Sequence, residues 1–114
     1  MTFKAKYPLS NRIAECIRVR EKYPDRIPII CERNWNSKIQ LLDKSKFLVP
    51  HDFTLGQFMY TLRIRLQLPC EKALFIFING TLQPINSGLS ILYDTYKDND
   101  GFLYLAFSEE NVFG

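Results

Sequence analysis

The alternation of apolar and polar positions divides the chain into helical and extended segments. Apolar residues recur every three to four positions in residues 9–22 and again from Leu55 to Leu66, which is the spacing of one face of a helix. Short apolar or β-branched runs between turn residues predict strands. The predicted helices span 9–22, 55–66 and 88–96, and the predicted strands span 27–33, 46–50, 73–78 and 102–108.

Two of the helices carry residues that start or stop helical structure. Ser10 is a candidate cap for the first helix, which is expected to stop at Tyr23 because a residue that precedes a proline avoids the helical region. Thr54 and Gln57 fit a capping box, in which each side chain accepts a backbone N–H that the helix leaves unpaired. Residues 2–7 form either a separate turn of helix or an unstructured arm.

Prolines and glycines set the limits of the strands. Pro28 cannot donate a ladder hydrogen bond, so it lies either near the start of the strand 27–33 or at a sheet edge. The strand 46–50 begins with lysine and ends with proline, which is typical of an exposed edge. Residues 34–45 are polar and are expected to form a loop. Asn79-Gly80 predicts a tight turn.

The order of these elements predicts the fold class. A hairpin, a crossover helix and further strands make the order of a β-grasp, an α+β fold that packs a helix across a mixed sheet. No local pattern dictates which strands pair. The 114 residues fit one domain, in which we expect an N-terminal helical extension (1–22), a β-grasp core (27–108) and a C-terminal tail (109–114).

The composition argues against several classes of function. The longest apolar run, Ala73–Ile78, is far shorter than the roughly 20 residues of a membrane span, and no apolar signal segment is visible, so a cytoplasmic location is expected. The three cysteines, Cys16, Cys31 and Cys70, are expected to be free thiols. With His51 as the single histidine, no metal site or cofactor is expected. Without a P-loop, GxSxG or HExxH motif, the chain is not expected to be an enzyme.

Charge is spread unevenly along the chain. Residues 1–65 hold 13 Lys and Arg against 6 Asp and Glu, whereas residues 66–114 hold 2 against 6. One basic face and one acidic face are therefore expected. A basic face can bind nucleic acid, an anionic membrane or an acidic protein. Nucleic acid is not expected here, because no interleaving of aromatic and basic residues is evident.

Two further features suggest binding. If the edge of the strand 46–50 is open, an extended peptide can add to it as another strand; the equally weighted alternative is a core strand with a protected edge. The second feature is the end of the sequence, Phe113-Gly114. A glycine carboxylate has no Cβ to obstruct a narrow enzyme channel.

Several segments together resemble a known family. They are Lys22–Glu32 (KYPDRIPIICE), Asp43–Pro50 (DKSKFLVP), Thr54–Phe58, Glu71–Phe77 and Asp100–Tyr104. In this order they resemble the autophagy-related ubiquitin-like modifiers, the family of yeast autophagy-related protein eight, the GABA-type-A-receptor-associated protein and microtubule-associated light chain three. The resemblance covers nearly the whole chain and implies a ubiquitin-like β-grasp.

The resemblance implies a modifier that is joined to lipid. An activating (E1-like) enzyme would adenylate Gly114, carrier (E2-like) enzymes would pass it on as a thioester, and it would end as an amide on phosphatidylethanolamine. A cysteine protease would process or delipidate the protein. The protein would then be found in the cytoplasm and, when lipidated, on the autophagosome membrane. The alternative is a module of the same fold that is never conjugated and acts in vesicle trafficking or microtubule binding.

The resemblance also implies recruitment of receptors and adaptors that carry a short aromatic-x-x-aliphatic motif, docked along Lys46–Val49. The aromatic site would comprise Glu15, Val19, Pro28, Ile30, Lys46, Leu48 and Phe102. The aliphatic site would comprise Phe47, Val49, Pro50, Phe53, Phe58 and Arg65. Acidic residues that flank the motif would meet Arg26, Lys46 and Arg65.

Three positions depart from the pattern of the family. Thr61 stands where relatives carry a larger apolar residue, which predicts a shallower or more selective aliphatic pocket. Phe53 is bulkier than the usual leucine and is expected to compensate. The N-terminal arm has Leu9 where an aromatic residue is common and carries less basic charge than usual, which argues against a membrane-tethering or tubulin-binding role for it. Trp35 has no obvious role in the family and is expected to be a partly exposed loop residue.

Overall fold

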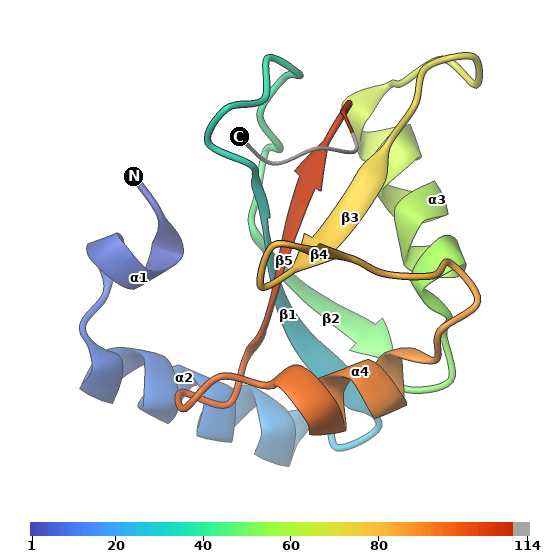
Figure 1. Ribbon diagram of the computed structural model, residues 1–114. Coiled ribbons are helices and arrows are strands. Elements are labelled where there is room, and N and C mark those ends of the chain that lie inside the picture. Colours follow the sequence, from blue (N-terminus) through green and yellow to red (C-terminus); the bar gives the residue numbers. More distant parts are fainter. Residues whose placement is uncertain (111–114) are drawn as a thin grey trace.

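The computed structural model describes residues 1–110, and its elements follow the predicted order (Figure 1). The helices are α1 (Phe3–Lys6), α2 (Leu9–Lys22), α3 (Leu55–Leu66) and α4 (Leu89–Tyr96). The strands are β1 (Arg26–Arg33), β2 (Lys46–Pro50), β3 (Phe75–Ile78), β4 (Thr81–Leu82) and β5 (Leu103–Ser108).

The strands form one mixed sheet in the order β2-β1-β5-β3-β4. β1 and β5 run parallel, and the other neighbouring strands run antiparallel. After the β1–β2 hairpin, α3 leads the chain across the sheet to β3, on the far side of β5. This arrangement confirms the β-grasp and the α+β class with its N-terminal helices. The pairing order, which the local sequence did not specify, places β2 at one edge and β4 at the other.

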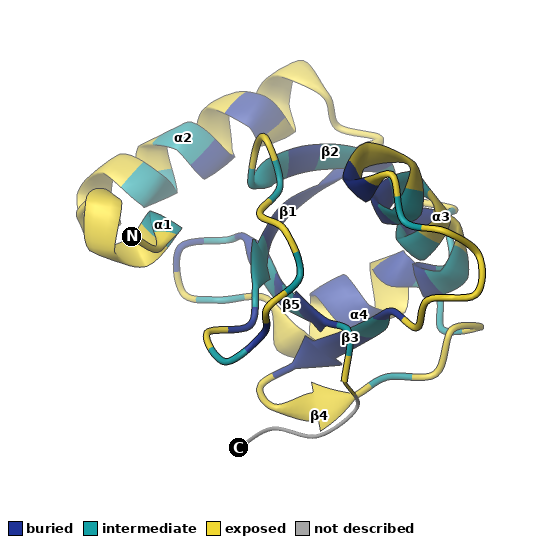
Figure 2. Ribbon diagram, turned by 90° about the horizontal axis from the view of Figure 1, so that it is seen from above, coloured by how far each residue is buried: buried dark blue, intermediate teal, exposed yellow. Residues whose placement is uncertain are grey.

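One face of the sheet packs against α3 and α4 and forms the main core. Buried residues gather on the sheet and on the sides of these helices that face it (Figure 2). The buried stripe of α3 consists of Leu55, Phe58, Leu62 and Leu66. Alternate residues of β1 enter the same core, namely Ile27, Ile29 and Cys31. Removal of this apolar surface from water stabilises the fold by about 25 cal/mol per Å².

The opposite face of the sheet carries a smaller core, which α1 and α2 cover. Cys16 of α2 packs here with Ile30 of β1 and with Phe102, and all three are buried. The ring of Phe3 in α1 meets the ring of Phe102 edge-on, with centroids 5.5 Å apart. Without the N-terminal helices, Ile30 and Phe102 would be exposed to water, so this extension is part of the packed structure.

Asp100 anchors the smaller core. Its buried carboxylate accepts hydrogen bonds from Arg12 Nε at 2.9 Å, from the Phe102 backbone N–H at 2.8 Å and from the Tyr104 hydroxyl. Burial, and then the hydrogen bond to Asp100, raise the pKa of Tyr104 above its ordinary value. Because a buried charge is stable only while its partners are present, this network ties α2 to the turn before β5.

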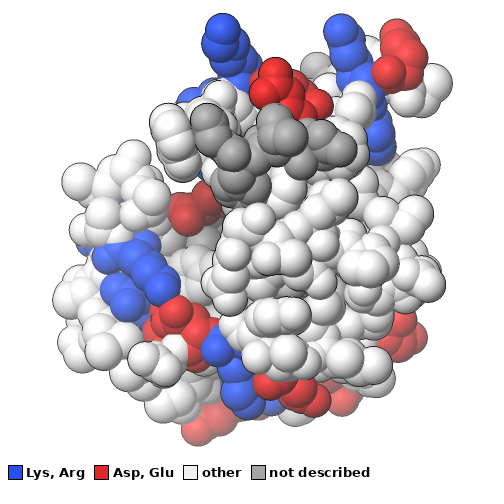
Figure 3. Space-filling model, viewed as in Figure 1, with Lys and Arg blue, Asp and Glu red and all other residues white. Residues whose placement is uncertain are grey.

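The basic and acidic parts of the chain pair with each other. Besides the Arg12–Asp100 pair, Lys4 Nζ lies 2.6 Å from Asp98 Oδ1. On the face shown in Figure 3, basic and acidic residues are interspersed, so the expected separation into one basic and one acidic face is not seen there. The reason is that folding places α1 and α2 beside the acidic turn at residues 98–101.

The N-terminal cap of α2 differs from the prediction. Ser10 does not cap α2; the helix begins at Leu9, and the preceding Pro8 occupies the N-cap position without a side-chain hydrogen bond. Pro8, with φ −67° and ψ 159°, already turns the chain into the helix, which begins and ends at the predicted residues, 9 and 22. Residues 2–7 contain helix α1, whose first turn is capped by the Thr2 side chain.

The other boundary residues act as predicted. The capping box of Thr54 and Gln57 is formed at the start of α3. Asn79 and Gly80 have φ values of 51° and 76° and join β3 to β4 in a tight turn. Pro28 lies near the start of β1, because the pairing of β1 with β5 begins only at the next residue.

The 34–45 loop is fastened to the rest of the protein. Asn34 donates its backbone N–H to β5 at 2.8 Å, and the Gln40 side chain donates to the carbonyl of the last residue of α3. Glu109 accepts hydrogen bonds from the Ser37 hydroxyl and, at 3.1 Å, from the Lys38 backbone N–H. The bond from Ser37 is the main cause that lowers the pKa of Glu109 to about 2. Hydrogen bonds therefore hold the loop in a fixed position beside the start of β2.

Gly101 should tolerate substitution less well than Gly80. Gly101 has φ +95°, and a Cβ there would lie 2.6 Å from Cys16 Sγ, whereas a Cβ at Gly80 would meet nothing within 4 Å. We expect Gly101→Ala to lower the free energy of unfolding by about 2–4 kcal/mol, because left-handed strain and overpacking add. Gly80→Ala should cost about 1 kcal/mol. Urea denaturation measures both, and equal losses would contradict the packing of Cys16 against Gly101.

Acid should release the 34–45 loop through Glu109. Its pKa is about 2 in the folded protein and near 4.5 without these contacts, so its stabilisation is complete above pH 4.5 and is lost as the pH falls from 4.5 toward 2. We expect the NMR shift of the Lys38 amide to follow this titration. In Glu109→Gln that dependence should disappear. A wild-type midpoint near 4.5 would show that the bonds from Ser37 and Lys38 do not hold the carboxylate.

Candidate functional site

The exposed edge of β2 is the centre of the candidate site. β2 lies at the end of the sheet order and pairs only with β1 among the described residues. Its second edge therefore leaves backbone N–H and C=O groups available to another extended chain. Of the two alternatives that the sequence left open for the strand 46–50, the structure shows the open edge.

The two faces of β2 differ in burial. Phe47 and Val49 are buried in the main core, whereas Lys46, Leu48 and Pro50 are half-buried on the face toward α2. Successive side chains point to opposite faces of the sheet, as in any strand. An extended chain laid along this edge would thus have the main core on one side and the N-terminal helices on the other.

The residues predicted for the aromatic site come together on the α2 side. The register places Lys46 opposite Ile30 and Leu48 opposite Pro28, and Phe102 packs against Ile30. From α2, Val19 is buried and Glu15 forms an ion pair with Lys46. Ile30 and Phe102 are fully buried, so they form the floor of the site, and Lys46 and Leu48 form its accessible rim.

Glu15 forms ion pairs with both Arg18 and Lys46. Glu15 accepts hydrogen bonds from Arg18 at 2.8 Å and from Lys46. These bonds, the one from Arg18 first, lower the pKa of Glu15 to about 2. Glu15 is therefore ionised at neutral pH and neutralises Lys46, so an acidic ligand has to compete with Glu15 for this lysine.

The other two cations predicted to meet acidic residues also have partners. Arg65 forms a two-pronged pair with Asp43, with its Nη2 2.9 Å from the carboxylate. Arg26 donates to the Leu48 carbonyl at 3.5 Å and lies over the Tyr23 ring. No pattern in the sequence indicated Asp43 as a counter-ion, because the pair joins positions 22 residues apart.

The predicted aliphatic site is built around Phe47. Its ring meets that of Phe58 edge-on at 5.4 Å, and the Arg65 guanidinium lies 5.6 Å from its centroid. Val49 is buried beside it in the main core, and Phe53 is partly buried at the margin of that core. The residues assigned to this site therefore lie together on the α3 side of β2, with the exception of Pro50, which is on the α2 side with Leu48.

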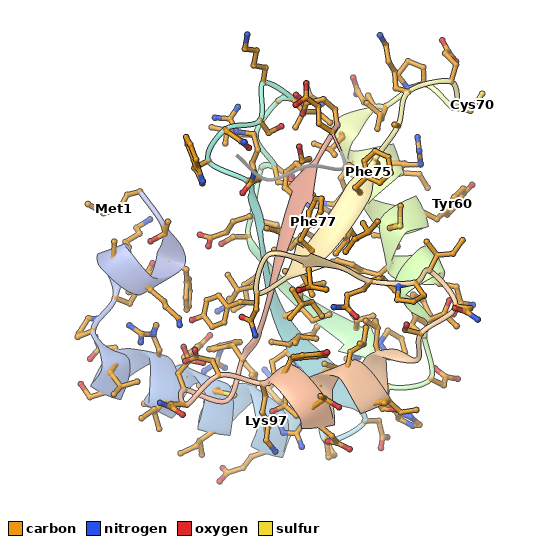
Figure 4. The ribbon with its side chains drawn as sticks, viewed as in Figure 1. Met1, Tyr60, Cys70, Phe75, Phe77 and Lys97 are labelled. Atoms are coloured by element: carbon orange, nitrogen blue, oxygen red, sulfur yellow. The ribbon has the colours of Figure 1, made fainter. Side chains whose placement is uncertain are left out.

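Thr61 lies next to a shallow apolar hollow along α3. Its hydroxyl donates to the Gln57 carbonyl at 3.3 Å. Phe53, Tyr60 and Ile85 line the same hollow, which has a volume of about 560 Å³. Tyr60 projects outward from α3 (Figure 4). Sequence reasoning missed Tyr60 and Ile85, because their exposure depends on how the segment before α4 crosses α3.

A larger hollow separates the N-terminal helices from the 34–45 loop. Its volume is about 920 Å³, and it is visible as a notch in Figure 3. Glu15 and Lys46 lie on its border, so it continues the aromatic site past the start of β2. Trp35 and Leu41, which are 81% and 69% exposed, also line it. Sequence reasoning placed Trp35 in the loop but assigned it no site.

Other chemistry has little support among the described residues. Cys16 and Cys31 are buried, and burial raises the pKa of both thiols, whereas Cys70 is exposed in the loop after α3 (Figure 4). Within residues 1–110 no three metal-ligating side chains cluster, and no helix is long and apolar enough to cross a membrane. The predicted conjugation residue, Gly114, lies outside the described residues.

Comparison with known proteins identifies the family. Residues 11–114 match the family model described as "Autophagy protein Atg8 ubiquitin like". Autophagy-related protein 8 of Pichia angusta is 54% identical over 112 residues, which cover 98% of this chain and 90% of the relative. Autophagy-related protein 8c of Arabidopsis thaliana is 51% identical over 113 residues, which cover 99% and 95%.

The fold comparison agrees with the sequence comparison. The crystal structure of Trypanosoma brucei ATG8 superposes with a TM-score of 0.93 at 46% identity, and the match covers all of this chain and 98% of that one. The β-grasp with its N-terminal helices is thus a ubiquitin-like fold. From the family model, the identities and the fold together, this chain belongs to the Atg8 family of ubiquitin-like autophagy proteins.

Proposed function

We propose that this chain is a non-enzymatic modifier that is conjugated through Gly114 to phosphatidylethanolamine on autophagosomal membranes and recruits receptors and adaptors with aromatic-x-x-aliphatic motifs. The observation that carries the recruiting role is the open edge of β2 between two different apolar faces. Membership of the Atg8 family supports the conjugating role.

Strand geometry explains the spacing of the motif. Side chains alternate along an extended peptide, so positions i and i+3 point to opposite faces of the sheet. An aromatic residue at i can therefore enter the site around Leu48 while the aliphatic residue at i+3 enters the site around Phe47. A spacing of i and i+2 would direct both side chains to the same face.

The two sites also define the direction of the peptide. The proposed aromatic site centres on Lys46 and Leu48, whereas the proposed aliphatic site extends to Pro50 and Phe53. Since the aromatic residue comes first in the motif, the peptide runs parallel to β2. Residues that precede the aromatic residue then lie beside the end of the 34–45 loop.

The expected affinity suits reversible recruitment. Burial of an aromatic side chain of about 150–250 Å² gives a gross gain of roughly 4–6 kcal/mol, and the aliphatic residue adds about 1.5–3 kcal/mol. Ordering of the peptide offsets much of this gain. A micromolar dissociation constant, equivalent to about −8 kcal/mol, is the expected result.

Membrane attachment requires the lipid. A basic residue near an anionic surface contributes about 1 kcal/mol. Lys4 is already paired with Asp98, which leaves Lys6 as the lysine of the N-terminal arm without an ion pair among the described residues, too little to hold the protein at a membrane. Two acyl chains, at about 0.8 kcal/mol per buried CH₂, are enough for stable anchoring. The proposed partners therefore include activating and carrier enzymes and a delipidating cysteine protease as well as the membrane.

Truncation of the rim should weaken the binding of motif peptides without unfolding the protein. Leu48→Ala removes apolar contact with the aromatic residue. Lys46→Ala removes a cation from the rim and leaves Glu15 with Arg18 as its partner, so the carboxylate repels acidic flanking residues more strongly. We expect each change to weaken binding about tenfold by fluorescence anisotropy, since 1.4 kcal/mol corresponds to tenfold. Ile91→Ala, at an exposed position on α4, is the control. Unchanged affinity in both rim variants would contradict the assigned site.

Conjugation should depend on the terminal glycine. We expect the protein, incubated with the activating and carrier enzymes, ATP and phosphatidylethanolamine liposomes, to give a lipidated band that floats with the liposomes. Deletion of Gly114 should abolish this band, because the terminal carboxylate then belongs to Phe113, whose side chain obstructs a narrow enzyme channel. If the wild-type chain gives no such band while it still binds motif peptides, it is the non-conjugated interaction module instead.

A further inference from the structure

We propose that the preferred partners carry an additional apolar side chain two positions before the aromatic residue of the motif, and that this side chain binds in the hollow between Trp35, Leu41 and α1. The inference rests on the proposed peptide-binding function and adds a third specificity site to it. The motif then becomes apolar-x-aromatic-x-x-aliphatic.

The hollow has apolar walls on both sides. Trp35 and Leu41 border it from the loop, and Met1 and Phe3 border it from the N-terminal arm. Trp35 is 81% exposed, which leaves most of a large aromatic surface in water. A partner that covers this surface gains binding free energy from the large buried area of the indole. The entropic cost is small, because a tryptophan side chain has few rotatable bonds to order.

The loop wall is held in place before any partner binds. Glu109 fastens the loop at Ser37 and Lys38, and Gln40 fastens it to the end of α3. Trp35 and Leu41 lie on either side of these fastened positions. A partner therefore does not have to order the loop, which lowers the entropic cost of binding there.

The register of a bound strand places the additional side chain here. Position i−2 has the same parity as position i, so its side chain points to the α2 side of the sheet. At about 3.3 Å per residue it lies about 7 Å before the aromatic residue. For a peptide parallel to β2 this direction leads past Lys46 toward Lys44, and the hollow lies along Lys44, Ser45 and Lys46.

Charge also favours such a peptide over a second copy of this chain. Lys6 and Lys44 line the hollow, and neither forms an ion pair within residues 1–110. Acidic residues beside the apolar one would therefore find unneutralised cations. Glu15, Glu32 and Asp43 also line the hollow, but Glu15 pairs with Lys46, Asp43 pairs with Arg65 and Glu32 accepts the Phe3 backbone N–H. A second copy would therefore bring the same unpaired lysines and, among the described residues of the hollow, no unpaired carboxylate to meet them.

The test uses two peptides that differ only at position i−2, with Ile in one and Ser in the other. Both carry acidic flanks and Tyr as the aromatic residue, so that Trp35, the single tryptophan of the chain, is the only one in the sample. We expect the Ile peptide to bind about five- to thirtyfold more tightly, equivalent to 1–2 kcal/mol at 1.4 kcal/mol per tenfold. It should also shift Trp35 emission to shorter wavelength, because it excludes water from the indole.

Variants separate the hollow from the rest of the site. Trp35→Ala and Leu41→Ser, both at exposed positions, should remove the preference for Ile while leaving the affinity for the Ser peptide unchanged. Ile91→Ala should retain the preference. Equal affinity of the two peptides for the wild-type protein would overturn this inference but not the proposed function. Failure of both peptides to bind would overturn both. A shift of Trp35 emission with protein concentration alone would overturn the inference in favour of self-association.

Discussion

The parallel pairing of β1 with β5 is the contact on which the other features depend. It joins the first strand of the sheet to the last one, so it closes the fold across nearly the whole chain. It leaves β2 at the edge, with backbone groups open to another strand. It also brings Phe102 and Asp100 against α2, and it supplies the backbone carbonyl that holds Asn34 at the start of the 34–45 loop.

The charges of this protein are used mainly to hold parts of the chain together. Arg12 and Lys4 tie the N-terminal helices to the acidic turn, and Lys46 is neutralised by Glu15. Because its nearest cations are already paired, the β2 edge gains little from a simple attraction to acidic partners. Apolar burial on the two faces of β2 is then the main source of affinity, and acidic residues of the ligand act mostly on selectivity and on the rate of association.

The candidate site is composite, which limits what the sequence can show of it. The alternation of Lys46–Pro50 was readable from the sequence, and so was the capping box that starts α3, because both depend on residues close together in the chain. The resemblance to the family also named residues from α2, β1, β2, α3 and the position just before β5 that the fold brings together. No pattern in the sequence pointed to Asp43 as the partner of Arg65, or to Trp35 and Leu41 as a wall, since these depend on contacts between distant residues.

The sequence by itself determined α2, α3, α4, the four longer strands and their order, because local apolar periodicity and turn residues act over a few positions. That order favoured a β-grasp, whereas α1 and the short strand β4 were established only by the structure. The sequence did not determine the cap of α2, where Pro8 rather than Ser10 precedes the first turn, or the distribution of charge over the surface. Only the tertiary structure decided which edge of the sheet stays open, which cations are neutralised and where the hollows lie. These properties are set by strand pairing and by packing between distant segments, which no local pattern encodes.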